Sequence, residues 1–256
     1  MATIAVTGSA GGIGTATRAR LEAAGDRVIG IDLTDAEVIA DLATTEGRVS
    51  AIAEVTGACG GVLDGLVVAA GIANGHAPTL VSVNFFGAVA TLDGLRPLLA
   101  RGTDSSVVAL SSNSTTTQPG FPVPLAEMCL AGDEDGARVL AGDDAVSAYP
   151  ATKLALARWV RRHATTPDWI GAGIRLNAIA PGFTDTPMTA GMWEFVSSIG
   201  DIFPIPVGRP GRPEEIASLI AYLLSADAGF MVGSFITVDG GTEAALRPDD
   251  WPRPIA

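Results

Sequence analysis

The chain has 256 residues, of which 48% are hydrophobic and 17% are charged, and its formal net charge at pH 7 is −12. The acidic balance excludes a nucleic-acid partner, because no basic patch is available to neutralise phosphates. No run of 18 or more apolar residues occurs, so we expect no membrane span. The first residues enter a strand pattern without a basic leader, which predicts a cytoplasmic protein. With two cysteines and two histidines, we expect neither a disulfide framework nor a metal site.

A phosphate-binding turn is predicted near the N-terminus. Residues 4–7 form a short apolar run, and a helical pattern follows over residues 13–24. Between them lies a glycine-rich turn, Gly8-Ser9-Ala10-Gly11-Gly12-Ile13-Gly14, with the spacing Thr-Gly-x-x-x-Gly-x-Gly. Such a turn lets backbone N–H groups approach a phosphate at the helix N-terminus, where the helix dipole favours an anion. A tight structural turn without a ligand is the alternative.

Asp32 indicates which nucleotide this turn would bind. It ends an apolar run at residues 27–31, and an acidic residue about 20 positions beyond the turn is where a ribose 2′-hydroxyl is held. Its carboxylate would repel a 2′-phosphate, and no Arg or Lys occupies positions 9, 10, 33 or 34 to offset that charge. We therefore expect NAD rather than NADP. The alternative is that Asp32 only caps the following turn.

The rest of the chain alternates strand and helix patterns. Further strands are predicted at residues 38–40, 65–68, 106–110, 174–179 and 235–238, and helices at residues 44–59, 79–100, 149–164 and 213–224. This alternation, without a linker, predicts one α/β domain over residues 1–256 with a Rossmann-type, doubly wound sheet of seven parallel strands. Residues 113–147 are irregular, and we expect a small, mainly helical insertion there, with helices near 125–130 and 136–140.

Tyr149 and Lys153 lie four residues apart, which puts them on one face of a helix. We expect this helix to begin near Tyr149, with Pro150 in the first turn, where the N–H that proline lacks would have no partner. A cation beside a phenol favours the phenolate and lowers a pKa that is ordinarily about 10. Such a pair can move a proton near neutral pH, although Tyr-x-x-x-Lys also arises by chance in many helices.

Taken together, these motifs resemble the short-chain dehydrogenase/reductase family. The matching pieces, in family order, are Thr7-Gly8-x-x-x-Gly12-x-Gly14, Ala69-Ala70-Gly71, Asn84, Ser111-Ser112, Tyr149-x-x-x-Lys153, Pro181-Gly182 and Asp239-Gly240-Gly241. The chain departs from the family pattern where Val68-Ala69 replaces the usual Asn-Asn. It also separates Ser112 from Tyr149 by 37 positions, against about a dozen in the family. That long insertion is similar to the one in a subgroup, the bacterial 3α-hydroxysteroid dehydrogenases/carbonyl reductases.

The resemblance implies reversible hydride transfer between NAD(H) and a carbonyl or secondary alcohol. Tyr149 is the expected proton donor and acceptor. Lys153 would support it and hold the nicotinamide ribose, and Ser112 would polarise the substrate oxygen, with Ser114 a weaker candidate for that contact. Asn84 would bind a water molecule that relays protons; by residue type alone it is a buried polar group or a helix kink.

The resemblance also implies where cofactor and substrate lie. Thr186 would hold the nicotinamide carboxamide or, alternatively, cap the turn before Pro187. Residues 187–211 would form a lid in which Met188, Met192 and Trp193 present an apolar surface to the substrate. Residues expected to contact the cofactor are Gly8, Ser9, Gly12, Ile13, Gly14, Asp32, Leu33, Asp41, Leu42, Ala69, Ala70, Gly71, Tyr149, Lys153, Pro181, Gly182, Phe183, Thr184 and Thr186.

Substrate class and assembly are less constrained by the motifs. The insertion favours a hydroxysteroid or a related ketone. The alternatives are another bulky alcohol, terpenoid or aromatic, or a non-catalytic NAD-binding sensor. Family members usually form tetramers, and the insertion would obstruct one of their contact faces. We therefore expect a homodimer through residues 213–224 and 235–238, with a tetramer as the alternative.

Overall fold

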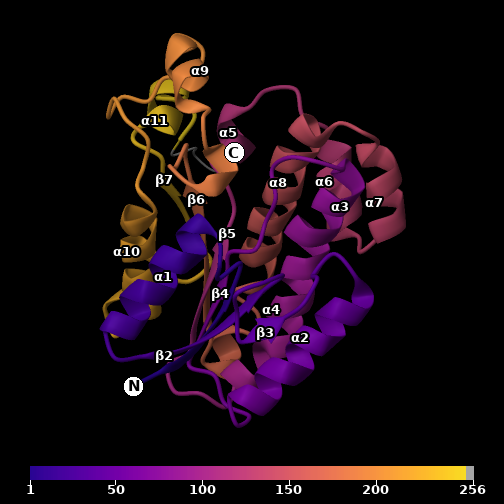
Figure 1. Cartoon of the computed structure of the whole chain (residues 1–256), viewed down its shortest axis with the longest axis vertical. Helices are drawn as coiled ribbons and strands as arrows, with labels where there is room; N and C mark the ends of the chain where they lie inside the picture. The colour runs from indigo at the N-terminus through magenta and orange to yellow at the C-terminus, as the bar shows by residue number, and fades with distance from the viewer. Residues whose placement is uncertain (252–256) are drawn as a thin grey trace.

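The computed structural model describes residues 1–251, which contain a seven-stranded sheet whose neighbouring strands are all parallel (Figure 1). The strand order is β3-β2-β1-β4-β5-β6-β7, so the chain reverses direction across the sheet between β1 and β4. The predicted doubly wound α/β fold is confirmed. The strands are β1 (Thr3–Thr7), β2 (Arg27–Asp32), β3 (Val38–Ile39), β4 (Gly65–Val68), β5 (Ser106–Leu110), β6 (Arg175–Pro181) and β7 (Phe235–Val238).

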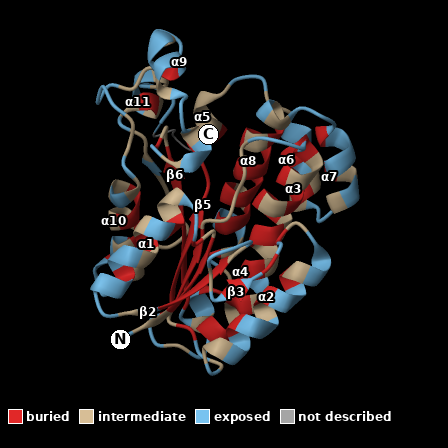
Figure 2. Cartoon of the chain, viewed as in Figure 1, coloured by how far each residue is buried: buried red, intermediate tan, exposed pale blue. Residues whose placement is uncertain are grey.

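Helices cover both faces of the sheet, because the strands are apolar on both sides. On one face α1 (Gly12–Ala23) packs against α10 (Pro213–Leu224), and on the other lie α2 (Thr45–Ala58), α4 (Ala88–Leu99) and α8 (Ala145–His163). Strand residues alternate between the two cores: Ala5 belongs to the α2/α4/α8 side, whereas Ile4 and Val6 belong to the α1/α10 side. Figure 2 shows the central strands fully buried between these layers.

The predicted helix over residues 79–100 runs without a break from Ala77 to Leu99, but it is not α-helical throughout. It consists of α3 (Ala77–Val81), a π-helical turn η1 (Ser82–Gly87) and α4. The π turn carries Asn84, whose side-chain amide hydrogen-bonds the backbone of Ile72. Single π turns within α-helices are frequent at functional sites. Asn84 is thus both a buried polar group and the centre of a helix irregularity.

One stretch within the described residues, Ala77–Leu99, has the length and mean hydropathy (1.2) of a membrane-spanning helix. It contains no unbroken run of 18 apolar residues, but its mean hydropathy is as high as that of a membrane-spanning helix. Within the protein, 56% of that window is buried, against the sheet and the neighbouring helices. The hydropathy of this stretch is therefore accounted for by its place in the core.

The helix that carries Tyr149 begins earlier than predicted. Asp144 caps α8, accepting a hydrogen bond from the Ser147 N–H (3.0 Å), so Pro150 lies in the second turn and not in the first. Proline there cannot donate to the carbonyl of Val146 one turn back. The side-chain amide of Gln118 donates to that carbonyl instead (3.0 Å). A residue of the insertion thus satisfies the carbonyl that Pro150 leaves free.

The insertion is helical, as expected, and packs onto the main body. Its helices are α5 (Ser114–Thr117), α6 (Val123–Leu130) and α7 (Glu134–Ala141). The latter two begin two residues before the predicted starts, because Pro122 and Asp133 occupy the N-cap positions. Leu125, Cys129 and Ala137 are buried in the same core as α8 and the sheet. The insertion extends the α2/α4/α8 side of the molecule (Figure 1).

Candidate active site

A cavity of about 530 Å³ opens at the carboxyl ends of β1, β2 and β4. This is the edge at which open parallel sheets bind ligands, beside the point where the strand order reverses. Twelve residues predicted to contact a nucleotide line it: Gly8, Gly12, Ile13, Gly14, Asp32, Leu33, Asp41, Leu42, Ala69, Ala70, Gly71 and Thr186, together with Met188 of the predicted lid. The loop after each strand therefore contributes to one continuous surface.

The glycine turn forms the floor of this cavity. Gly8 has a left-handed backbone (φ +68°), and a Cβ at Gly14 would overlap the Gly8 carbonyl oxygen, so the turn folds tightly onto α1. α1 has 12 residues, and no side chain caps its N-terminus at Gly11. The N–H groups of its first turn are thus available to an anion in the cavity. This cradle fits a dinucleotide diphosphate.

Asp32 is oriented at the end of β2 by two backbone donors. Its carboxylate accepts hydrogen bonds from the N–H groups of Ala10 (2.9 Å) and Leu33 (2.7 Å). A cation that sequence reasoning did not consider, Arg18 of α1, lies against Gly30 of the same strand. Its guanidinium is paired with the carboxylates of Glu37 and Glu22. Its charge is therefore already neutralised, which leaves the acidic character of this end of the cavity intact.

Several predicted cofactor residues do not line this cavity. The hydroxyl of Ser9 is buried without a hydrogen-bond partner, and a Cβ at Gly30 would lie against it. Residues 181–184 and the Tyr149–Lys153 pair lie outside the lining as well. The lining residues that the prediction missed are Ala10, Gly11, Ile31, Thr34, Ala40, Ile72, Val83, Leu110 and Pro187. Most of them are apolar or small residues next to predicted positions. Their residue types do not indicate a cofactor contact, and only their place near the ends of the strands could have predicted one.

Ser112, Tyr149 and Lys153 converge beside the cavity. The Lys153 amine is buried and donates to the carbonyl of Leu110 at the end of β5 (2.9 Å). It lies 5.9 Å from the centre of the Tyr149 ring. The Ser111 hydroxyl donates to the Lys153 carbonyl (2.9 Å), which ties α8 to β5 a second time. The Ser112 hydroxyl accepts from the Ser114 N–H (3.2 Å) and lies within hydrogen-bonding reach of the Tyr149 phenol.

Burial dominates the electrostatics of this group. It raises the pKa of the Tyr149 phenol, and the hydrogen bond with Ser112 offsets this only in part. It lowers the pKa of Lys153 from 10.5 to about 8. The protein groups alone therefore do not produce the lowered tyrosine pKa that the sequence suggested. An additional positive charge beside the phenol is needed for that.

Asn84 is fully buried, and both ends of its amide are engaged. Its oxygen accepts from the Ile72 N–H (2.9 Å), and its nitrogen donates to the Ile72 carbonyl (2.9 Å) and the Thr152 hydroxyl (3.4 Å). A Cβ at Gly71 would lie 3.1 Å from the Lys153 amine and 3.2 Å from the Asn84 oxygen. Asn84 therefore holds the loop after β4 in place, and its side-chain oxygen and the Lys153 amine both lie next to Gly71.

The predicted lid stands above the sheet edge. It contains η3 (Pro187–Thr189) and α9 (Trp193–Ser198), which projects from the body of the molecule (Figure 1). Thr186 caps η3 through reciprocal hydrogen bonds with Thr189, and its methyl group lies over Gly12. Met188 and Met192 are each 41% exposed, and the Trp193 ring packs against Phe183 at 5.9 Å. The segment has few buried side chains, as expected of an element that moves.

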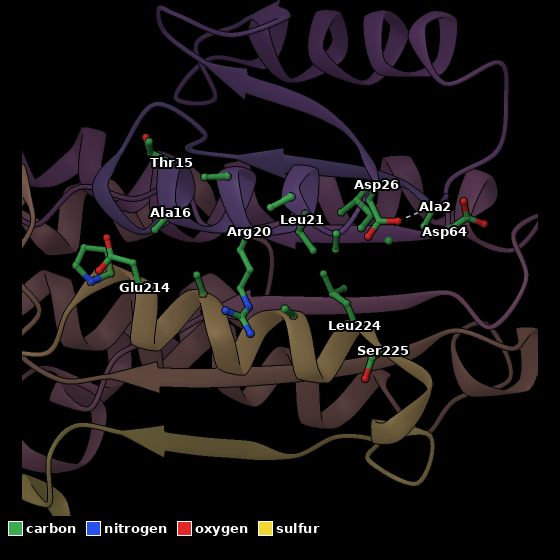
Figure 3. A pocket seen from close by; sticks show the side chains of 18 of the residues that line it. Ala2, Thr15, Ala16, Arg20, Leu21, Asp26, Asp64, Glu214, Leu224 and Ser225 are labelled. Carbon is green, nitrogen blue, oxygen red and sulfur yellow. Dashed lines mark hydrogen bonds between the residues drawn. The ribbon is translucent and has the colours of Figure 1, made fainter.

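A larger groove of about 1220 Å³ runs between α1 and α10 (Figure 3). It extends toward the amino ends of the strands, where Asp26 immediately precedes β2 and Asp64 immediately precedes β4. Nine of its 25 lining residues are alanines, and the Arg175 guanidinium at its inner end is buried and donates to backbone carbonyls at the C-terminus of α10. The predicted catalytic side chains Ser112, Tyr149 and Lys153 do not line this groove.

The chain is similar in sequence and in fold to several dehydrogenases. The chain is 43% identical to the 3-alpha-hydroxysteroid dehydrogenase/carbonyl reductase of Comamonas testosteroni, over 98% of this chain and 100% of the relative. The chain belongs to the short-chain dehydrogenase/reductase family. The predicted resemblance, including the subgroup, is thereby confirmed. A model described as enoyl-(acyl carrier protein) reductase matches residues 134–243.

Two further relatives agree with this family. The cis-4-hydroxycyclohexanecarboxylate dehydrogenase of Sinomonas cyclohexanicum is 32% identical over 93% of this chain and 95% of that protein. The crystal structure of the 3-alpha-hydroxysteroid dehydrogenase from Pseudomonas sp. B-0831, complexed with NADH, superposes with a TM-score of 0.89 at 42% identity. That similarity covers 96% of this chain and 99% of the Pseudomonas chain.

The buried Lys153 amine predicts a pH-dependent stability. Because its pKa is about 8 in the folded protein and 10.5 ordinarily, the folded state binds fewer protons between these values, and stability rises with pH. Relative to Lys153→Met, the wild-type protein should gain roughly 2–3 kcal/mol between pH 7 and pH 10. Urea unfolding of both proteins across this range measures the difference, and parallel curves would contradict the assignment.

Proposed function

We propose that this protein is an NAD(H)-dependent oxidoreductase that interconverts a bulky secondary alcohol and its ketone, most closely a hydroxysteroid. The observation that carries the proposal is the convergence of Ser112, Tyr149 and Lys153 beside a cavity whose lining includes Leu110 and Gly71, the neighbours of the Lys153 amine. The names of the Comamonas and Pseudomonas relatives support the substrate class. A positioned acid/base and a hydride carrier are the two requirements of this reaction.

The residues of the cavity fit NAD. The N–H groups of the α1 first turn would hold the diphosphate, and the Asp32 carboxylate would accept from the adenosine ribose hydroxyls. A 2′-phosphate there would meet Asp32 without a free cation, because Arg18 is paired with Glu37. NAD(H), when bound, supplies or accepts the hydride.

The protein's own task is to move one proton and to orient one oxygen. During ketone reduction the Tyr149 phenol donates a proton to the substrate oxygen, and during alcohol oxidation the phenolate takes it back. The Ser112 hydroxyl donates to the same oxygen and polarises it. Lys153 contributes positive charge beside the phenol when its amine is protonated, and Asn84 would hold a water molecule between Lys153 and solvent.

The lid supplies an apolar contact surface suited to a large flat substrate. Three of its side chains are partly exposed: Met188, Met192 and Trp193. Ser114 lies beside Ser112, and its hydroxyl is buried without a hydrogen-bond partner among the described residues. Flexible methionines adapt to different apolar shapes. Another bulky alcohol, such as a terpenoid or aromatic one, is therefore the second candidate within the same chemistry. A non-catalytic sensor is disfavoured by the complete set of serine, tyrosine and lysine.

Tyr149→Phe tests the proposal. Removing the phenol should lower kcat by at least roughly 100-fold, since general acid–base catalysis contributes about that much or more. The Kd for NADH should stay within about twofold of the wild-type value, because the ring remains in place. Tyr222→Phe, which removes the chain's other phenol, is the matched control and should leave kcat unchanged. Substantial turnover by Tyr149→Phe would refute the acid/base role.

We infer that the protein is a cytoplasmic homodimer. The insertion packs along α8 and α3, the side on which a tetramer contact through α4 and α8 would form. On the opposite side Phe230, just after α10, is fully exposed, and Tyr222 of α10 is 44% exposed. Burial of these rings in a shared interface through α10 and β7 would remove a large apolar surface from water.

Light scattering tests this assembly. The wild-type protein should have twice the mass of one chain, and Phe230→Asp should shift it toward the monomer, because a carboxylate would have to be desolvated in the interface. Val139→Asp, at an apolar side chain on the insertion that is 82% exposed, is the control and should remain a dimer. A wild-type mass of four chains would contradict the inference.

A further inference from the structure

We propose that Arg48 and Glu134 form a positioning pair for the adenosine end of the dinucleotide cavity, through which the insertion sets the affinity for the cofactor. The inference rests on the proposed function, since it concerns the site where NAD would bind. Neither residue lines the cavity. Both act through the loop after β3, whose Asp41 and Leu42 do line it.

Arg48 lies in the first turns of α2 and joins four segments of the chain. Its Nε donates to the Leu42 carbonyl (2.8 Å) and its Nη2 to the Ala43 carbonyl (3.3 Å). Nη2 also donates to the Ser82 carbonyl (3.0 Å), at the start of the π turn that carries Asn84. One guanidinium therefore holds the adenosine-side loop against the helix irregularity behind the predicted catalytic residues.

Glu134 completes this arrangement from the insertion. It is the first residue of α7, and its two carboxylate oxygens accept from Nη1 and Nη2 of Arg48, both at 2.7 Å. Such a bidentate pair fixes the plane of the guanidinium as well as its distance. The contact spans 86 positions in the sequence. Figure 1 shows α7 and α2 on the same flank of the molecule.

Burial makes the pair dependent on both partners. The Arg48 side chain is 10% exposed and that of Glu134 24% exposed. Removal of one partner from such a pair leaves the other charge without compensation in a poorly solvated place. Without Glu134, the guanidinium would turn toward water and release the carbonyls of Leu42 and Ala43. The inserted helix thus supplies the counter-charge that keeps Arg48 directed at the loop.

The loop has little freedom to compensate, because it is packed closely on its inner side. A Cβ at Gly87, which ends the π turn, would lie 2.8 Å from the Leu42 carbonyl oxygen and 3.0 Å from its Cβ. Leu42 itself is buried. A shift of the Leu42 carbonyl would therefore displace the wall of the cavity and not an exposed loop tip. The adenosine end should respond to it, and the nicotinamide end should not.

Glu134→Gln tests the proposal, with ligand binding measured alongside turnover. The Kd for NADH, followed by fluorescence, should rise about three- to thirtyfold. The Kd for AMP, measured by competition, should rise by the same factor, whereas the Kd for nicotinamide mononucleotide should not change. At saturating NADH, kcat and the KM for the ketone should match the wild-type values. Glu134→Asp, which keeps the charge, should recover part of the affinity.

Glu127→Gln is the matched control, because it removes an exposed carboxylate from α6 of the same insertion and should leave all three Kd values unchanged. Unaltered NADH and AMP binding by Glu134→Gln would overturn the proposal. Equal weakening of AMP and nicotinamide mononucleotide would also overturn it, since that pattern indicates a general structural role. If Glu134→Gln does not fold, Arg48→Lys, which keeps a cation but loses the bidentate geometry, decides by the same titrations.

Failure of the underlying function has a different signature. If the wild-type protein binds neither NADH nor AMP, the proposed cofactor is wrong, and the positioning role falls with it. If the wild-type protein binds both and Glu134→Gln binds both equally well, only the positioning role is wrong.

Discussion

The hydrogen bond from the Lys153 amine to the Leu110 carbonyl joins α8 to the carboxyl end of β5, and the proposed chemistry depends on it. It keeps a cation in the interior, where burial already brings its pKa to about 8. It also fixes the register between helix and strand that brings Tyr149 next to Ser112. The same burial raises the tyrosine pKa, so the site is complete as an acid/base only when further positive charge is present beside the phenol.

The parallel sheet explains why residues far apart in the chain meet at one edge. Three strands contribute to the site at their carboxyl ends: Asp32 is the last residue of β2, Gly71 follows β4 and Ser112 follows β5. These positions could be predicted from the sequence, because small or polar residues follow short apolar runs. The fold class and the family were predicted correctly, and twelve of the residues predicted to contact the cofactor line one cavity.

Other features had no local signal. The π turn around Asn84 carries a side-chain contact with Ile72, which lies 12 residues away. The early start of α8 depends on Asp144, and the position of Pro150 is tolerated because Gln118 reaches the carbonyl of Val146. The Arg48–Glu134 pair joins residues 86 positions apart. Each of these is decided by tertiary contacts, which neither periodicity nor motif spacing reports.

The central claim is hydride transfer between NAD(H) and a bulky alcohol or ketone at this site. The most direct measurement is steady-state turnover on a panel of 3α-, 17β- and 20β-hydroxysteroids, their ketones and small aromatic ketones, each with NAD(H) and with NADP(H). The account predicts turnover of at least one hydroxysteroid, with higher kcat/KM for NAD(H) than for NADP(H). No turnover of any panel member, by a protein that binds NADH, would contradict it and favour a sensor.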